Sequence, residues 1–168
     1  MSQELEEITR VTHRNELYYI AGFFDGEGSV SLTVKSTNGL RCGYEFCTLI
    51  AFTQKTKDIL EWVADTLGVE RRIYPKGNDG YSLWVFSNAD VMKVAGILEL
   101  YCKLKKPQLA LIIRACEIRL NKDFHYKKGE LLELLVIAKE LRLLNGHNST
   151  ELSTDLDEVK RSIEAAYS

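Results

Sequence analysis

The clearest pattern of hydrophobic and polar positions lies in residues 29–37 and 44–54, where apolar side chains alternate with polar ones. A period of two predicts strands that each have one buried face. The turn-forming segment 38–43 separates them, so the two strands are expected to pair as a hairpin. The positions expected to face the core are Val30, Leu32, Val34, Phe46, Thr48, Ile50 and Phe52.

The same arrangement is repeated in outline further along the chain. Residues 55–69 carry apolar side chains at helical spacing, and Gly68 predicts the end of that helix. Two short strands are expected on either side of residues 76–80, followed by a helix that Ser87 or Asn88 caps. The residues of these strands expected to face the core are Ile73, Tyr81, Leu83 and Val85.

The segment Leu17–Gly28 predicts a helix that is apolar on nearly every side, so burial of one face is not enough for it. Gly22 and Gly26 lie four residues apart and let another backbone approach closely, which offsets the cost of about 0.5–1 kcal/mol that glycine carries in a helix. We expect this helix to be capped at Asn15 or the residue before it. Its natural partner is the same helix of a second copy, related by a two-fold axis.

The order α-β-β-α-β-β-α predicts an α+β fold with an antiparallel sheet, helices on one face of it and the other face free. Residues 1–14 are expected to form an acidic leader, 15–105 the core and 106–168 the appended C-terminal helices. The last helix is expected to be capped by Ser153 or Thr154. No linker rich in proline, glycine or serine divides the chain, so residues 1–168 are expected to form a single domain.

The charge is unevenly distributed along the 168 residues, although the formal net charge is only −2. Residues 31–128 carry 16 Lys and Arg against 10 Asp and Glu, whereas both ends of the chain are acidic. The middle of the chain is therefore suited to face phosphate. The four cysteines show no zinc-ligand spacing, and no segment is apolar enough for a membrane span or a signal peptide. A soluble protein of a reducing, intracellular compartment is expected.

Asp25 and Glu27 stand where the apolar helix ends, which is an unfavourable place for an anion because a helix C-terminus carries about half a negative charge. A two-fold contact would bring two Glu27 side chains and the carbonyls near Gly26 together, and oxygen ligands of this kind suit Mg²⁺. The spacing does not fit a calcium loop, and a phosphate-binding glycine loop would precede a helix. A glycine-capped helix end with two surface acids stays open as the alternative.

The sequence "IAGFFDGEG" (Ile20–Gly28) resembles the LAGLIDADG motif of homing endonucleases, with matches at Ala21, Gly22, Asp25 and Gly28. The likeness continues in "TQKT" (residues 53–56) and "KLKKPQ" (residues 103–108), which are similar to segments of the single-motif, homodimeric members. It covers roughly residues 15–120, and the predicted order of helices and strands agrees with it.

The resemblance implies an intron- or intein-type homing endonuclease that cuts both strands of a long, partly symmetric DNA site as a homodimer with Mg²⁺, or with Mn²⁺ or Ca²⁺ at the same site. It gives Glu27 the place of the metal ligand, aided by the Gly26 carbonyl, and gives Gln54 and Lys105 places around the attacking water and the scissile phosphate. Asp25 matches a motif position that is mostly structural and holds the helix ends together. Asp58 lies near a place where the family often has a basic residue, which leaves Lys55 or Lys57 as substitutes.

The free sheet face is expected to bind the DNA major groove. The candidate contacts are Ser31, Thr33, Lys35, Thr37, Asn38, Arg41, Glu45, Cys47, Arg72, Tyr74, Lys76, Ser82 and Trp84. The candidate dimer interface comprises Tyr19, Ile20, Gly22, Phe23, Asp25 and Gly26. Two alternatives remain: a non-cleaving protein of the same fold, which would be a maturase-like RNA-binding protein or a DNA-binding regulator, and an α+β interaction domain whose first helix only dimerises.

Overall fold

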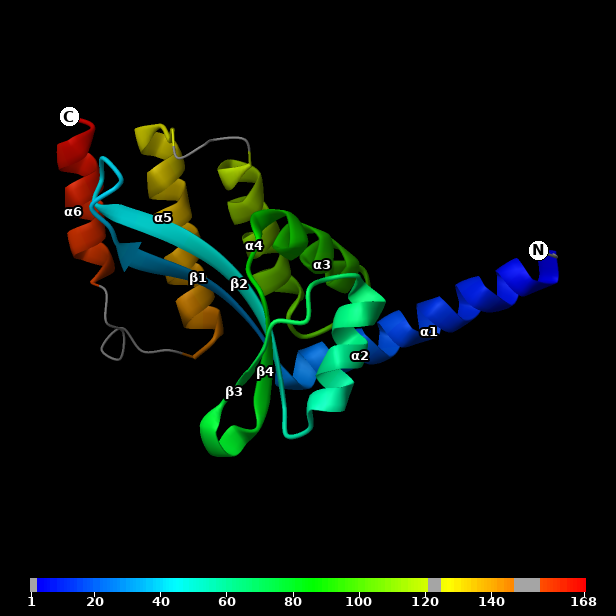
Figure 1. Ribbon diagram of the computed structural model, residues 1–168. Helices are drawn as coiled ribbons and strands as arrows, with labels where there is room; N and C mark the ends of the chain where they lie inside the picture. The colour runs from blue at the N-terminus through cyan, green and yellow to red at the C-terminus, as the bar shows by residue number, and fades with distance from the viewer. Residues whose placement is uncertain (1–2, 121–124, 147–154) are drawn as a thin grey trace.

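The computed structural model describes residues 3–120, 125–146 and 155–168. Four strands and six α-helices follow one another in the order expected for the core, with one short 3₁₀ helix in the second hairpin (Figure 1). Their bounds are α1 Gln3–Glu27, β1 Gly28–Ser36, β2 Tyr44–Gln54, α2 Lys57–Leu67, β3 Ile73–Pro75, η1 Gly77–Asp79, β4 Tyr81–Val85, α3 Asn88–Tyr101, α4 Lys106–Arg119, α5 Lys128–Leu144 and α6 Leu156–Ala166.

The strands form one antiparallel sheet in the order β1-β2-β4-β3. The register of the first hairpin pairs Val30 with Ile50 and Val34 with Phe46, so both strands turn their apolar positions to the same side. All seven positions of β1 and β2 expected in the core are buried. The α+β fold, the two hairpins and a sheet face left free by the helices are therefore confirmed.

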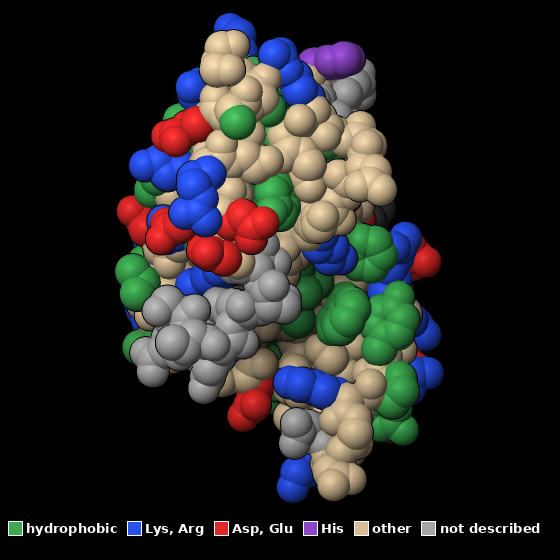
Figure 2. Space-filling model, turned by 90° about the vertical axis from the view of Figure 1, so that its left-hand side faces the viewer, with side chains coloured by type: hydrophobic (Ala, Val, Ile, Leu, Met, Phe, Trp, Pro, Cys, Tyr) green, Lys and Arg blue, Asp and Glu red, His purple; other side chains and the backbone are tan. Residues whose placement is uncertain are grey.

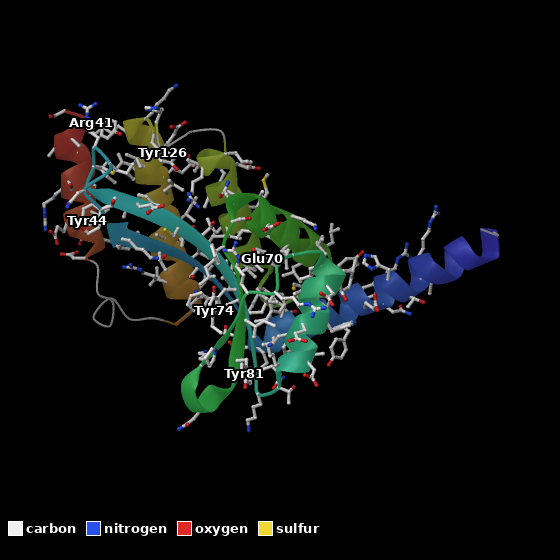
Figure 3. The ribbon with its side chains drawn as sticks, viewed as in Figure 1. Arg41, Tyr44, Glu70, Tyr74, Tyr81 and Tyr126 are labelled. Atoms are coloured by element: carbon white, nitrogen blue, oxygen red, sulfur yellow. The ribbon has the colours of Figure 1, made fainter. Side chains whose placement is uncertain are left out.

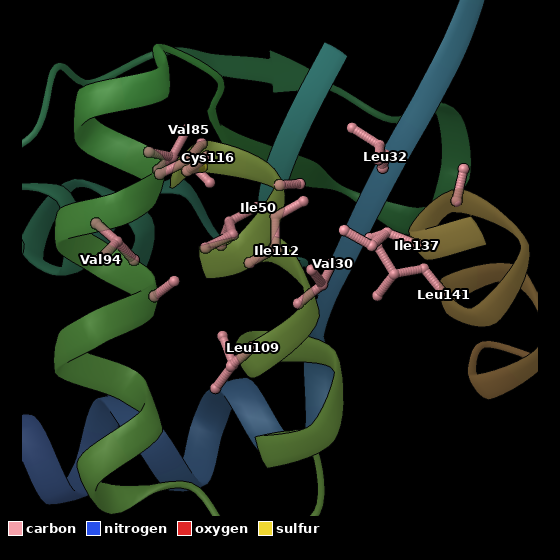
Figure 4. Packing of buried hydrophobic residues seen from close by; sticks show 14 of the residues in the cluster. Val30, Leu32, Ile50, Val85, Val94, Leu109, Ile112, Cys116, Ile137 and Leu141 are labelled. Carbon is pink, nitrogen blue, oxygen red and sulfur yellow. The ribbon is translucent and has the colours of Figure 1, made fainter. Parts of the chain in front are cut away.

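A single hydrophobic cluster runs from the sheet into the C-terminal helices. In Figure 4, Leu109 and Ile112 of α4 lie against Val30 and Ile50 of the sheet, and all four side chains are at most 1% exposed. Ile137 and other apolar residues of α5 extend this cluster beside β1. The helices that follow residue 105 are thus part of the same core, because they cover sheet surface that α1, α2 and α3 leave open.

The first helix begins earlier than expected. It runs without interruption from Gln3, so Asn15 lies inside it and is not its cap, and most of the expected leader is helical. Residues 3–25 contain no proline, and their one glycine, Gly22, does not break the helix. In Figure 1 the N-terminal half of α1 projects away from the rest of the molecule.

One expectation for β4 was wrong. Tyr81 is 36% exposed and not in the core, because it pairs with Gln54 on the last rung of the sheet. Ser82 lies on the open face as expected, opposite Thr53 and Tyr74, but it is only 4% exposed. Its hydroxyl lies 3.4 Å from that of Thr53 and accepts a hydrogen bond from the indole N–H of Trp84 at 3.1 Å, so neighbouring side chains cover it.

The C-terminal helices also hold the first hairpin in place. The Asn145 amide donates to the carbonyl of Val30 at 2.8 Å, and the Ser162 hydroxyl donates to the carbonyl of Cys42 at 2.8 Å. Asp155 caps α6 through the backbone N–H of Asp157, while the expected caps Ser153 and Thr154 lie outside the described residues. Among the described residues, no helix has both the length and the apolar character needed to cross a membrane.

Candidate active site

The motif helix passes directly into the sheet. Glu27 is the last residue of α1 and Gly28 is the first of β1, with no loop between them. A Cβ atom at Gly28 would overlap the ring of Phe24, which is fully buried and packs against Phe52 with ring centroids 4.9 Å apart. Glycine is therefore required at residue 28, and the close packing fixes where the backbone of Glu27 leaves the helix.

The carboxylate of Asp25 binds the segment between α3 and α4 of its own chain. It accepts hydrogen bonds from the backbone N–H groups of Lys103 at 2.7 Å, Leu104 at 3.2 Å and Lys105 at 3.0 Å. The ammonium group of Lys105 donates in return to the carbonyl of Asp25 at 2.5 Å. Four hydrogen bonds thus join the end of α1 to the start of α4, which agrees with the structural role expected for Asp25.

The surroundings of Asp25 and Cys102 determine the charge of both side chains. Burial alone would raise the pKa of Asp25, but hydrogen bonds from the backbone of Lys103, Lys105 and Leu104 and from the Cys102 thiol outweigh it and hold the pKa below its ordinary value. Burial and the neighbouring Asp25 charge raise the pKa of Cys102 to about 12. Asp25 is accordingly an anion and Cys102 a neutral thiol near pH 7.

A polar hollow of about 430 Å³ opens beside Glu27 at the end of the sheet. Its lining comes from the α1–β1 junction, the end of β2 and the β3–β4 turn: Gly26, Glu27, Gly28, Ser29, Thr53, Gln54, Lys55, Lys76 and Asn78. The structure therefore brings together three residues that the sequence placed at the catalytic site, Gly26, Glu27 and Gln54. Lys105 is not part of the lining, since its ammonium group is bound to the carbonyl of Asp25.

The orientation of Gln54 is fixed by its neighbours. Its side-chain oxygen accepts the backbone N–H of Lys55 at 2.8 Å, which leaves the amide NH₂ group as the part available to a ligand. Gly80, at φ +96°, presses the β3–β4 turn against this strand end, where an added Cβ would lie 2.5 Å from the carbonyl oxygen of Gln54. A turn distant in sequence is thereby packed against the end of β2.

The structure separates the two lysines considered as substitutes for a basic residue near Asp58. Lys57 is paired with Glu61 at 3.0 Å along α2. Lys55 lines the hollow. Lys76, which the sequence placed only on the DNA-binding face, lines it as well, and Asn78 was missed because only the folded turn brings it there.

The free sheet face carries most of the expected DNA contacts at its surface. Thr33, Lys35, Tyr74 and Trp84 are exposed, and the rings of Tyr74 and Trp84 lie 5.0 Å apart. In Figure 2, hydrophobic side chains gather at the lower right beside Lys and Arg side chains, and acidic side chains gather at the left. A polar and basic surface with exposed aromatic rings is compatible with nucleic-acid binding.

Arg72, one of the expected contacts, is engaged within the chain, and so is its neighbour Arg71. The guanidinium of Arg72 pairs with Glu70 at 2.6 Å and lies over the ring of Phe86, while Arg71 pairs with Asp65 of α2. Figure 3 shows Arg41 and Tyr44 beside α6, far from Tyr74 and Tyr81 on the second hairpin. The other candidates on the two strands and their loop are exposed or half-buried: Ser31, Thr37, Asn38, Arg41, Glu45 and Cys47.

The residues of the expected dimer interface differ in exposure. Ile20 was wrongly placed there, because it is 0% exposed in the core of its own chain. Gly22 and Gly26 are exposed, and an added Cβ at either would meet no heavy atom within 4 Å. Phe23 is half-buried, with its ring stacked 6.0 Å from that of Phe52. Tyr19 is 58% exposed.

Three exposed apolar side chains near this surface were missed in the sequence. Tyr18 is 56% exposed, and Leu100 and Leu104 are each 73% exposed. Tyr18 lies edge-on to Tyr101 at the end of α3, with ring centroids 4.8 Å apart. Tyr18 and Leu100 stand in segments that are already largely apolar, so they become informative only once α1 and α3 are known to be neighbours.

The comparison with known proteins agrees with this geometry. The sequence profile of the LAGLIDADG-like domain family matches residues 14–98. The homing endonuclease I-ApeII of Aeropyrum pernix is 30% identical over 74 residues, which make up 44% of each chain. The aligned region thus spans less than half the length of that relative.

Solved structures match nearly the whole chain. The archaeal intron-encoded homing endonuclease I-Vdi141I, in complex with DNA, is 25% identical with a TM-score of 0.79 and covers 91% of this chain and 97% of its own. The homing endonuclease I-CvuI, in complex with an I-CreI target, has a TM-score of 0.78 at 20% identity and covers 92% and 96%. The second likeness shows the fold alone.

Proposed function

The chain belongs to the LAGLIDADG-like domain family, and from this membership we propose that it is a homing endonuclease that hydrolyses one phosphodiester in each strand of a specific double-stranded DNA site. The observation that carries the proposal is the hollow beside Glu27, where a carboxylate, an amide and two lysines meet at the end of the free sheet face. A phosphodiester needs these groups: an anionic ligand for a cation, and donors for its own oxygens.

Binding of duplex DNA is supported by the shape and chemistry of the free face. Two antiparallel strands form a ribbon that fits the major groove, where base edges present a full donor and acceptor code. Thr33 and Lys35 stand on the exposed side of β1, in line with the strand end that reaches the hollow. The relative I-Vdi141I was solved as a DNA complex. We assign recognition to this face and cleavage to the hollow.

The residues of the hollow fit a magnesium ion. No group of three or more His, Cys, Asp or Glu that could hold a metal occurs in the part of the chain that the structure describes. Mg²⁺ does not need such a cage, because it commonly binds through one or two carboxylates together with waters and substrate phosphate. Glu27 and the carbonyl of Gly26 would hold it, and Mn²⁺ or Ca²⁺ could occupy the same place.

In the reaction a water oxygen bonds to phosphorus, the bond from phosphorus to the 3′ oxygen breaks, and protons pass from the water to solvent and from solvent to the 3′ oxygen. A cation held by Glu27 and the Gly26 carbonyl would lower the pKa of the attacking water and offset charge on the phosphate. The NH₂ group of Gln54 donates to a phosphate oxygen or to the water. Lys105 does not contact the phosphate; its ammonium group binds the carbonyl of Asp25 and so positions the end of α1.

A homodimer is proposed because cutting two strands requires two sites and each chain provides one. Gly22 and Gly26 offer open surface on α1, and the apolar side chains of Tyr18, Tyr19 and Leu104 border it. A second copy of α1 would cover this surface across a two-fold axis. The two hollows would then face the two strands of one duplex.

The test is cleavage of a plasmid that carries the insertion locus without its intron, in the presence of Mg²⁺. The wild-type chain should linearise it. The Glu27→Gln variant should bind the same DNA but not cut it, whereas Glu140→Gln, which removes an exposed charge on α5, should cut like the wild type. Retained cutting by Glu27→Gln would contradict the metal assignment, and a wild-type chain that cuts no DNA would contradict the function.

A further inference from the structure

We infer that Lys76, on the turn between β3 and β4, is a catalytic residue that binds a non-bridging oxygen of the scissile phosphate. The inference rests on the proposed function and assigns to this turn a part in cleavage, in addition to the DNA contact expected for it. Lys76 lines the same hollow as Glu27 and Gln54. An ammonium group there can stabilise the negative charge that grows on the phosphate during attack.

The position of Lys76 is fixed by the fold of the turn. β3 ends at Pro75, and the backbone N–H of Lys76 donates to the carbonyl of Gly80 at 2.8 Å, which closes the turn. Gly80 in turn touches the end of β2, since its absent Cβ would lie 2.5 Å from both the carbonyl oxygen of Gln54 and the Cα of Lys55. The turn therefore cannot move toward β2 without a clash, and Lys76 is positioned relative to Gln54.

The charge of Lys76 is available for a ligand. Arg71, Arg72 and Lys57, the cations on neighbouring elements, are each paired with a carboxylate of the same chain. For Lys76 and Lys55 the described residues provide no such ion pair. Lys57 forms an ion pair with Glu61 on α2. The lysines that line the hollow are Lys55 and Lys76.

The balance of charge in the hollow favours an anion. The described residues that line it include two lysines, Lys55 and Lys76, and one acid, Glu27. These sum to a positive charge before any metal binds, so a phosphodiester is attracted even without the metal. We assign the phosphate contact to Lys76 rather than Lys55, because the turn that carries Lys76 is closed by its own hydrogen bond and packed against β2.

The first experiment measures single-turnover cleavage at saturating protein, on a duplex that the wild-type chain has selected from a random-sequence library. Lys76→Ala should cut about 100-fold more slowly, the size of effect seen when one donor to a developing charge is removed. Lys76→Arg should recover most of the rate. Lys160→Ala, which removes an exposed lysine on α6 at the far end of the sheet from the β3–β4 turn (Figure 1), should leave the rate unchanged.

A binding measurement without cleavage then tests the phosphate contact itself. In the Glu27→Gln background, replacing the scissile phosphate by an uncharged methylphosphonate should weaken DNA binding about tenfold, the value of one charge-assisted hydrogen bond. With Lys76→Ala added, the same replacement should cause no further loss. The inference is overturned if the methylphosphonate weakens binding equally with and without Lys76→Ala. It is also overturned if Lys55→Ala, and not Lys76→Ala, removes the effect of the methylphosphonate.

The turn itself supplies a positioning test. Gly80→Ala should slow cleavage although Lys76 is intact, because the added Cβ forces the turn away from Gln54. Gly77→Ala is the matched control in the same turn, with φ +55° and no heavy atom within 4 Å of the added Cβ, and it should cut faster than Gly80→Ala. Equal rates for these two variants would contradict the positioning role. A wild-type chain that cuts no duplex overturns the proposed function and this inference together, whereas normal cutting by Lys76→Ala overturns the inference alone.

Discussion

Asp25 and Lys105 are bound to each other twice, once in each direction. The carboxylate of Asp25 accepts the backbone N–H of Lys105 at 3.0 Å, and the ammonium group of Lys105 donates to the backbone carbonyl of Asp25 at 2.5 Å. An anion near a helix C-terminus is unfavourable unless donors and a cation offset it. Lys105 is that cation, and it places the start of α4 against the end of the motif helix.

Asp25→Asn should lower the free energy of unfolding by about 1.5–3 kcal/mol at neutral pH, because charge-assisted hydrogen bonds are lost and an amide NH₂ group faces backbone N–H groups. The pKa of Asp25 in the folded chain lies below 3.8, so its stabilisation is complete above that pH and disappears as the pH falls through the folded value. The stability difference between wild type and Asp25→Asn should therefore be constant near neutral pH and shrink as the pH falls below 3.8 in urea titrations.

Asp157→Asn is the control for this prediction. Its carboxylate also has a lowered pKa, because of its hydrogen bond with Lys139 at 2.7 Å, but the pair is exposed on α5 and α6. Solvent screens an exposed pair strongly, so the loss of stability should be much smaller than for Asp25→Asn. A difference for Asp25→Asn that stays constant with pH would show that the lost stability is not that of the carboxylate.

Gly28→Ala should destabilise the fold by at least about 1–3 kcal/mol, the usual cost of forcing extra atoms into a packed site, because the added methyl group overlaps the Phe24 ring. Chemical denaturation of the purified protein measures the effect. Gly129→Ala, near the start of α5 with no heavy atom within 4 Å of the added Cβ, should be neutral or slightly stabilising. Recovery of stability by Phe24→Leu in the Gly28→Ala background would identify the clash, and no recovery would argue against it.

Gly22→Ala should separate folding from dimerisation. Within one chain the added methyl group meets no heavy atom within 4 Å, and alanine favours a helix over glycine by about 0.8–1 kcal/mol, so the monomer should not be destabilised. A second helix packed on Gly22 would be pushed away. Sedimentation equilibrium should therefore show a weakened dimer while the helical circular dichroism is unchanged, and a dimer of wild-type strength would exclude Gly22 from the contact.

The order of elements followed from local patterns because each pattern has a direct physical cause. Alternation predicted both faces of β1 and β2, and Ser87 caps α3 as expected, with its hydroxyl accepting the N–H of Asp90 at 3.1 Å. The errors came where neighbours distant in sequence decide. Ser82 alternates like an exposed residue, but Thr53 of the paired strand β2 helps to cover it. Ile20 is as apolar as an interface residue, but its side chain is buried in the core of its own chain.

The sequence alone determined the hairpins, the helix that ends in Asp25 and Glu27, and the resemblance that assigned a role to each of these acids. These properties depend on residues close together in the chain, whose spacing is fixed by covalent geometry. Only the tertiary structure decided that Asp25 is satisfied by α4 of the same chain, that Lys105 faces the helix end, and that Lys76 shares a hollow with Glu27 and Gln54. The reason is that these groups meet through packing between distant segments, such as the contact of Gly80 with Gln54, and local sequence patterns do not encode such contacts.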